Sequence, residues 1–210
     1  MINLENSYLN LPDIFYSREI PETPPDPEWI RGNDDLARKL GIDLEWFHSS
    51  EALDLFSGRA FPEGIDPVAL AYGGHQFGGW VPRLGDGRAL LLGEILSESG
   101  RFDIQLKGSG RTGFSRGGDG KAPLGPVLRE YLVSEAMAAM SVPTTRALAA
   151  VATGGAVYRE EVLPGAIITR VASSHLRIGT FQFAMAHGGE RGVRAIADFA
   201  IERHDQDLKE

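Results

Sequence analysis

The first 32 residues show little periodicity in their apolar positions. Prolines cluster there at Pro21, Pro24, Pro25 and Pro27. Because proline fixes φ and has no backbone N–H, we predict an extended arm that lies over the rest of the protein. The arm is expected to be ordered because its large apolar side chains need burial: Leu9, Leu11, Ile14, Phe15, Tyr16 and Trp29.

Two short helices are predicted after the arm. Asn33 is typical of an N-cap, the apolar residues that follow it share one helical face, and Gly41 suits the left-handed position after a helix. The second helix is predicted over residues 51–56, with Ser50 as its cap.

The pattern changes to β-structure after residue 72. A glycine-rich aromatic segment, residues 73–79, leads to the turn Leu-Gly-Asp-Gly-Arg at residues 84–88. An apolar run over residues 89–95 and a polar turn follow, and residues 102–107 then alternate between apolar and polar. This pattern predicts a β-hairpin whose second strand has one buried face and one polar face.

A long loop, residues 108–125, carries seven glycines and precedes a helix predicted to begin at Pro126 and to end before Pro143. Structureless loops of this length are usually functional or disordered. Strands are predicted over residues 145–152, 156–162 and 166–171, with a turn at Pro164 and Gly165, and helices over residues 176–186 and 193–201. This order predicts an α+β fold and not the alternating βαβ pattern of a Rossmann fold.

Composition narrows the classes of function. The chain has 210 residues, 42% hydrophobic and 24% charged, which suits one large domain or two small ones. The absence of cysteine excludes disulfides and thiolate metal sites, so any metal requires carboxylate, imidazole or backbone oxygen ligands. No apolar run has the length of a membrane span, and the first residues lack a signal-peptide pattern, so we expect a cytoplasmic protein without a membrane partner.

The net charge of −8 argues against nucleic acid as a partner. The charge is unevenly distributed, however, because basic residues accumulate after residue 100: Arg101, Lys107, Arg111, Arg116, Lys121, Arg129, Arg146, Arg159, Arg170 and Arg177. A basic stretch in an acidic protein favours a compact anionic ligand.

Lys107 is the first candidate for binding such a ligand. It ends the alternating strand, after a glycine-rich turn and before a helix that carries Glu130 and Glu135. The order of turn, two strands, lysine and helix glutamate is that of a protein-kinase N-lobe, where the lysine pairs with phosphates and with the glutamate. A solvated surface lysine is the alternative, and periodicity does not choose between the two glutamates.

Other candidates are weaker when taken singly. Gly85, Gly87 and Arg88 form a turn that contacts phosphate or only closes a hairpin. The loop around Asp119 and Gly120 contacts a nucleotide or is only a turn. Arg170 and Arg177 converge on one anion or form structural salt bridges. The histidines lack metal-ligand spacing, and no nucleophile-elbow motif supports a serine hydrolase.

Several long strings together resemble the selenoprotein O family, and the resemblance extends from the arm to about Arg203. The strings are YGGHQFG (72–78), LGDGR (84–88), QLKGSG (105–110), REYLVSEAM (129–137), PTTRAL (143–148) and HLRIGTF (175–181). The resemblance implies a kinase-like fold that transfers AMP from ATP to hydroxyl groups of protein substrates. It also implies magnesium and an ATP orientation inverted relative to ordinary kinases.

Carried over residue by residue, the resemblance implies these nucleotide-binding positions: Gly85, Gly87, Arg88, Lys107, Asp119, Gly120, Glu130, Arg170 and Arg177. Glu130 is then the partner of Lys107. The family's catalytic base and magnesium ligands match no residue here and are expected beyond Glu210, so this chain is expected to be a truncated, inactive portion. Asp205 and Asp207 match a helix end.

We therefore predict three regions: the arm with short helices (1–72), a kinase-like N-lobe (73–172), and helices leading to a C-lobe (173–210). Two alternatives to an adenylyltransferase portion stay open, a non-catalytic interaction module and half of a conventional phosphotransferase. An exposed lobe interface is also expected to cause self-association.

Overall fold

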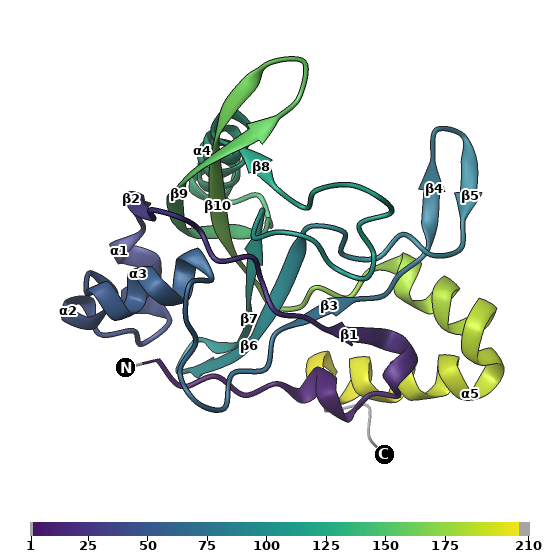
Figure 1. Ribbon diagram of the computed structural model, residues 1–210. Coiled ribbons are helices and arrows are strands. Elements are labelled where there is room, and N and C mark those ends of the chain that lie inside the picture. Colours follow the sequence, from purple (N-terminus) through teal and green to yellow (C-terminus); the bar gives the residue numbers. More distant parts are fainter. Residues whose placement is uncertain (1, 206–210) are drawn as a thin grey trace.

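One antiparallel sheet forms the centre of the computed structural model, which describes residues 2–205 (Figure 1). The sheet has eight strands in the order β1-β3-β6-β7-β10-β9-β2, with β8 paired to β10. The strands are β1 (Tyr16–Arg18), β2 (Glu28–Gly32), β3 (Val68–Leu70), β6 (Ala89–Ser97), β7 (Gly100–Lys107), β8 (Ala122–Pro123), β9 (Arg146–Tyr158) and β10 (Val162–Ala172). A separate hairpin, β4 (Gly74–Gln76) and β5 (Gly79–Val81), projects from the body in Figure 1.

Five α-helices surround the sheet. They are α1 (Asp34–Lys39), α2 (Leu44–Phe47), α3 (Ser50–Ser57), α4 (Leu124–Ala139) and α5 (Ile178–His204). Two 3₁₀ turns, η1 (Ser7–Asn10) and η2 (Asp13–Phe15), precede β1. The α+β prediction is confirmed, and so is the hairpin predicted after residue 88, which is β6–β7.

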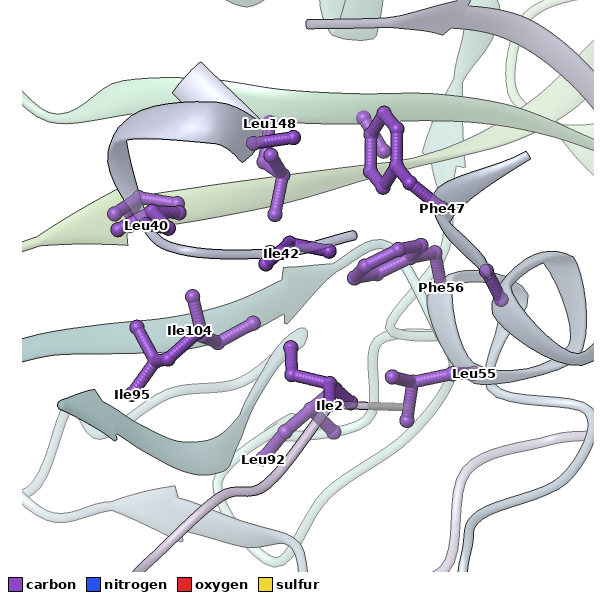
Figure 2. Close-up of a cluster of buried hydrophobic side chains, with 14 of the residues drawn as sticks. Ile2, Leu40, Ile42, Phe47, Leu55, Phe56, Leu92, Ile95, Ile104 and Leu148 are labelled. Carbon is purple, nitrogen blue, oxygen red and sulfur yellow. The ribbon is translucent and has the colours of Figure 1, made fainter. Parts of the chain in front are cut away.

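The largest core lies between the sheet and helices α1–α3 (Figure 2). Phe47 and Phe56 pack edge-to-face with ring centroids 5.6 Å apart. Leu148 of β9 and Ile104 of β7 belong to the same cluster and come from the sheet. These side chains are fully buried, so each contributes about 1.5–3 kcal/mol through removal of apolar surface from water.

Two further clusters hold α4 and α5. Val127 of α4 packs on small sheet residues, including Ala147 and Ala166, on the side of β9–β10 opposite α1–α3. Phe183 and Ile196 of α5 pack against Phe15 and the β3–β6 part of the sheet. The two ends of the sheet are therefore covered by different helices, and α5 also contacts the N-terminal segment.

The helix signals were partly correct. The Asn33 side chain caps α1 by accepting from Leu36 N–H, and Gly41 adopts φ +73°, as predicted. The cap of α3 is Ser49 and not Ser50. The Ser49 side chain accepts a hydrogen bond from Ala52 N–H. Helix α4 begins two residues before Pro126, which is tolerated there because N–H groups in the first turn have no helical acceptor.

The predicted C-terminal helices differ from the structure at their ends. They form α5, which is interrupted at Gly189, where φ is 57° and ψ is −152°. Arg177 is the N-cap of α5 and does not lie in its first turn. Asp205 is the C-cap, whereas Asp207 lies outside the described residues.

Two strand boundaries were wrong. The strands predicted over residues 145–152 and 156–162 are mostly one strand, β9, which continues through Gly154 at φ +68°. Pro164 and Gly165 do not form a turn, because both lie within β10 at a shift in its register with β9. A bulge accommodates a proline that cannot donate to the ladder, and the local sequence does not separate this case from a turn.

The arm is more regular than predicted. Its segments β1 and β2 join the sheet, pairing with β3 and β9. Leu11 and Phe15 are buried as expected, but Ile14 is exposed. The arm thus supplies the strand at each edge of the sheet, β1 and β2. These strands belong to the same sheet as strands of the region predicted to begin at residue 73.

The prediction of one apolar and one polar face on β7 is correct, but the polar face is buried as well. Asp103 and Gln105 are fully buried, and the Lys107 side chain is 20% exposed. Their partners come from α5, the glycine turn and α4. Alternation identified the strand correctly but did not show that ionic partners distant in sequence cover its polar face.

Helix α4 and its C-cap, Met140, also carry apolar side chains that the described residues leave exposed. Leu132 and Met140 are each 67% exposed, and Val133 lies beside them. We call these three residues the exposed α4 face. No helix within residues 2–205 is both long enough and apolar enough to cross a membrane.

Candidate functional site

An open cavity of about 620 Å³ lies where the glycine turn, the long loop, β10 and the start of α5 meet. Eight of the nine predicted binding residues line it: Gly85, Gly87, Arg88, Lys107, Asp119, Gly120, Arg170 and Arg177. Glu130, the ninth, lies against two of them. Segments separated by up to 92 positions in the sequence therefore come together.

The cavity lining is strongly cationic. Seven basic side chains and two acidic ones line it, an excess of five positive charges in a protein whose net charge is −8. The basic residues are Arg88, Lys107, Arg116, Lys121, Arg159, Arg170 and Arg177. Such a concentration of charge in a cleft attracts a small polyanion, since the surrounding protein focuses the field there.

Lys107 is paired with Glu130. The Nζ–Oε2 distance is 2.5 Å, and the two side chains are 20% and 32% exposed. Burial lowers the pKa of Lys107, although the hydrogen bond to Glu130 opposes that shift. The pair holds the ammonium group at the cavity wall, and an anion placed there gains a charge-assisted contact.

Glu135, the competing glutamate, has a different role. It accepts hydrogen bonds from the Arg146 guanidinium at 2.7 and 2.9 Å, and from Asn33 Nδ2 at 2.8 Å. The Ala147 N–H also donates to it, at 2.9 Å. Glu135 therefore fastens α4 to β9 and to the start of α1, and it lies away from Lys107.

Arg170 is held by two side chains. Its guanidinium contacts Glu130 Oε1 at 3.5 Å and donates to Gln105 Oε1. Gln105 in turn donates from Nε2 to Asp86 Oδ2, at 3.0 Å. Burial lowers the pKa of Arg170, while Glu130 and Asp86 counteract that shift. Side-chain contacts therefore connect α4 through β10 and β7 to the glycine turn.

Arg177 lies opposite, on Tyr72. Its guanidinium carbon is 4.7 Å from the Tyr72 ring centroid, and its Nη2 is 3.7 Å from Asp86 Oδ1. Burial raises the pKa of the Asp86 carboxyl, and Arg177 and Arg170 oppose this rise. Stacking on an aromatic ring restricts the planar guanidinium to one orientation at the cavity edge.

Asp119 is paired at the outer rim. Arg159 donates to both of its carboxylate oxygens, at 2.7 and 3.0 Å, and Lys121 N–H donates to it at 3.0 Å. The hydrogen bond from Arg159 is the main cause of the lowered pKa of Asp119. Gly120 adopts φ +69°, and a Cβ there would lie 1.8 Å from the Gly110 carbonyl oxygen, so only glycine fits.

The sequence did not single out several lining residues. Arg116, Lys121 and Arg159 were noted only as part of a basic stretch, and Tyr72 and Phe114 were not considered as site residues. Clustering of basic residues was the available signal, but it did not identify which of them face one cavity. Tyr72 begins the family string at residues 72–78, and that string was the available signal for it.

Residues 2–205 contain no group of three or more acidic or histidine side chains placed to hold a metal. The two lining carboxylates are already engaged, Asp86 with Gln105 and Asp119 with Arg159. The described residues therefore do not fit a magnesium ion on their own. The arrangement is suited to binding and orienting an anion through guanidinium, ammonium and backbone groups.

Comparison with known proteins identifies the family to which the chain is similar. The profile of the family described as protein adenylyltransferase SelO matches residues 1–210. A relative named protein nucleotidyltransferase YdiU from Nitrobacter hamburgensis is 58% identical over 204 residues, which are 97% of this chain and 40% of the relative. Its namesake in Methylorubrum populi is 59% identical over 207 residues, 98% of this chain and 42% of the relative. The chain thus spans about two fifths of the length of these curated relatives.

Proposed function

Because this chain belongs to the protein adenylyltransferase SelO family, we propose that it forms the ATP-binding part of a protein adenylyltransferase with a kinase-like N-lobe. The observation that carries the proposal is the cavity, in which eight predicted residues converge with an excess of five positive charges. ATP carries a triphosphate of high negative charge, and guanidinium and ammonium groups are its usual partners.

Each part of the cavity has a role in this proposal. The pair Lys107–Glu130 supplies a fixed ammonium for a phosphate oxygen, as in kinases. Arg170 and Arg177 would contact the nucleotide in the inverted orientation that the family resemblance implies. Gly85 and Gly87 let the backbone approach the phosphates because no Cβ intervenes.

In AMP transfer, a hydroxyl oxygen of the acceptor protein bonds to the α-phosphorus while the bond from that phosphorus to the oxygen it shares with the β-phosphate breaks. The hydroxyl proton passes to a general base, for which the family resemblance indicates no residue in this chain. Pyrophosphate then leaves with the added negative charge. The cationic lining favours this step because it stabilises charge that develops on the leaving group. Magnesium, when bound to the triphosphate, supplies further charge neutralisation. The described residues lack a ligand set for it.

Calorimetric titration with ATP and magnesium tests the proposal. The unmodified chain is expected to bind ATP, and Lys107→Ala is expected to weaken binding by about 1.5–3 kcal/mol, or roughly 10–100-fold in Kd. Lys39→Ala is the matched control, because Lys39 is an exposed lysine on α1 outside the cavity. The double variant Lys107→Ala/Glu130→Gln separates the lost contact from repulsion by the freed carboxylate.

Three outcomes decide the matter. Weakened binding by Lys107→Ala and the double variant, with no change for Lys39→Ala, supports the site. Equal binding by all variants places the nucleotide elsewhere. Absence of ATP binding by the unmodified chain refutes the proposal and favours the non-catalytic interaction module. Binding of a protein partner in the absence of nucleotide would support that alternative.

A further inference from the structure

Two hydroxyl groups of the long loop are hydrogen-bonded to the glycine turn. Thr112 Oγ1 donates to the Asp86 carbonyl at 2.7 Å and accepts from Phe114 N–H at 3.1 Å. Ser115 Oγ donates to the Gly87 carbonyl at 2.6 Å and accepts from Thr112 N–H at 2.8 Å. Each hydroxyl therefore links a backbone N–H of the loop to a consecutive carbonyl of the turn.

These contacts fix two peptide units. A peptide bond is planar, so holding the carbonyl of Asp86 also sets the direction of the Gly87 N–H, which donates to Gly85 O at 3.0 Å. Holding the Gly87 carbonyl likewise directs the Arg88 N–H away from the loop. Without the two hydroxyls, glycine at positions 85 and 87 would leave this backbone unusually free to rotate.

The loop also packs tightly beneath the turn. Phe114 is buried, and a Cβ at Gly85 would lie 2.1 Å from its Cγ, while one at Gly87 would lie 2.8 Å from its carbonyl oxygen. The Arg83 guanidinium covers the Phe114 ring at 5.1 Å. The turn is therefore held against a packed surface and does not project as a free flap.

We propose that Thr112 and Ser115 are positioning residues that preorganise the glycine turn for the phosphates of the nucleotide. The inference deepens the function proposed above and rests on it. Neither residue needs to touch the ligand: their hydroxyls hold the peptide units of residues 86–88 in the orientation that binds it. Ordering the turn before binding raises affinity because less conformational entropy is lost when the ligand arrives.

The test combines hydrogen exchange with ATP titration on the full chain. In the nucleotide-free protein, Thr112→Val is expected to accelerate exchange at the Gly87 amide about fivefold, the scale of one lost hydrogen bond. Thr112→Val/Ser115→Ala is expected to accelerate it further and to raise the Kd for ATP about tenfold. The matched control is Ser97→Ala, since Ser97 makes the same pair of backbone contacts at the far end of the β6–β7 hairpin.

Conservative replacement separates positioning from loss of stability. Thr112→Ser keeps the hydroxyl and is expected to restore both the slow exchange and the ATP affinity, with urea unfolding as a check on the global fold. The inference is overturned if the unmodified chain binds ATP and the double variant binds it equally well. It is also overturned if Gly87 exchange does not change in the nucleotide-free variants, a result that does not depend on whether the chain binds ATP.

Discussion

Arg203 allows the sharpest test of how α5 is attached to the sheet. Its guanidinium donates to Asp103 of β7 and to the Ser173 carbonyl, and lies 3.0 Å from Glu94 Oε1 of β6. Its side chain is 3% exposed, and both carboxylates are fully buried. It also lies over the Tyr8 ring at 5.5 Å. Arg203→Met keeps most of the side-chain volume and removes the charge.

The expected loss in the free energy of unfolding depends on the hydrogen-bond and ion-pair partners that the two carboxylates keep in the variant. Breaking a buried ion pair by removing one partner typically costs about 3–5 kcal/mol, because a charge is left uncompensated. Asp103 keeps the Tyr8 hydroxyl and the His175 N–H, and Glu94 keeps Arg101. These contacts place the expected loss near the low end, at about 3 kcal/mol. For a chain of this size, that lowers Tm by about 6–12 °C.

Urea and thermal unfolding followed by circular dichroism measure this loss. Arg38→Met is the matched control, since its ion pair with Asp35 is largely exposed and is expected to contribute less than about 0.5 kcal/mol. Adding Asp103→Asn to Arg203→Met is expected to recover part of the loss by removing one uncompensated charge. A loss below about 1 kcal/mol for Arg203→Met, or one equal to the control, would refute the reasoning.

Three other predictions concern the loop, acid stability and association. Gly120→Ala is expected to destabilise the protein by about 1–3 kcal/mol more than Gly41→Ala in urea unfolding, because both positions are left-handed but only Gly120 meets another atom, the Gly110 oxygen; equal losses would count against this. Burial lowers the pKa of His175 below its ordinary 6.5, so its stabilising neutral form is present above pH 6.5 and stability falls as pH drops below it. His175→Gln should reduce the change in the urea midpoint between pH 7.5 and pH 5. An unchanged dependence of the midpoint on pH would contradict the assignment of this effect to His175. The exposed α4 face is expected to make the chain self-associate, so a single monomeric species in sedimentation at high concentration would disprove this prediction.

Local signals account for the features that were predicted correctly. Asn33 and Gly41 delimit α1 because capping depends on one or two residues and their own backbone. The β6–β7 hairpin was evident from an apolar run, a polar turn and then a strand with a period of two. The β9 and β10 boundaries were missed because Gly154 and Pro164 break strands in most contexts, and here cross-strand pairing continues past both.

The family resemblance indicated residues of the candidate site and the pairing of Lys107 with Glu130, but not the other contacts among them. Family strings and the basic stretch indicated the cationic residues. Glu130 and Glu135 lie five positions apart on one helix, and only packing of α4 on the sheet directs the first to Lys107 and the second to Arg146. Arg159 was not identified because its partner Asp119 lies 40 positions away.

By itself, the sequence determined the α+β class, the family, the β6–β7 hairpin and eight of the 17 residues that line the cavity, because propensity, periodicity and local motifs act over a few positions. The tertiary structure decided which charges pair, why the polar face of β7 is buried, and how Thr112 and Ser115 hold the glycine turn. Those outcomes depend on contacts between residues as far as 19 to 100 positions apart. Such contacts arise only when the sheet and helices bury their apolar faces together, which no local pattern specifies.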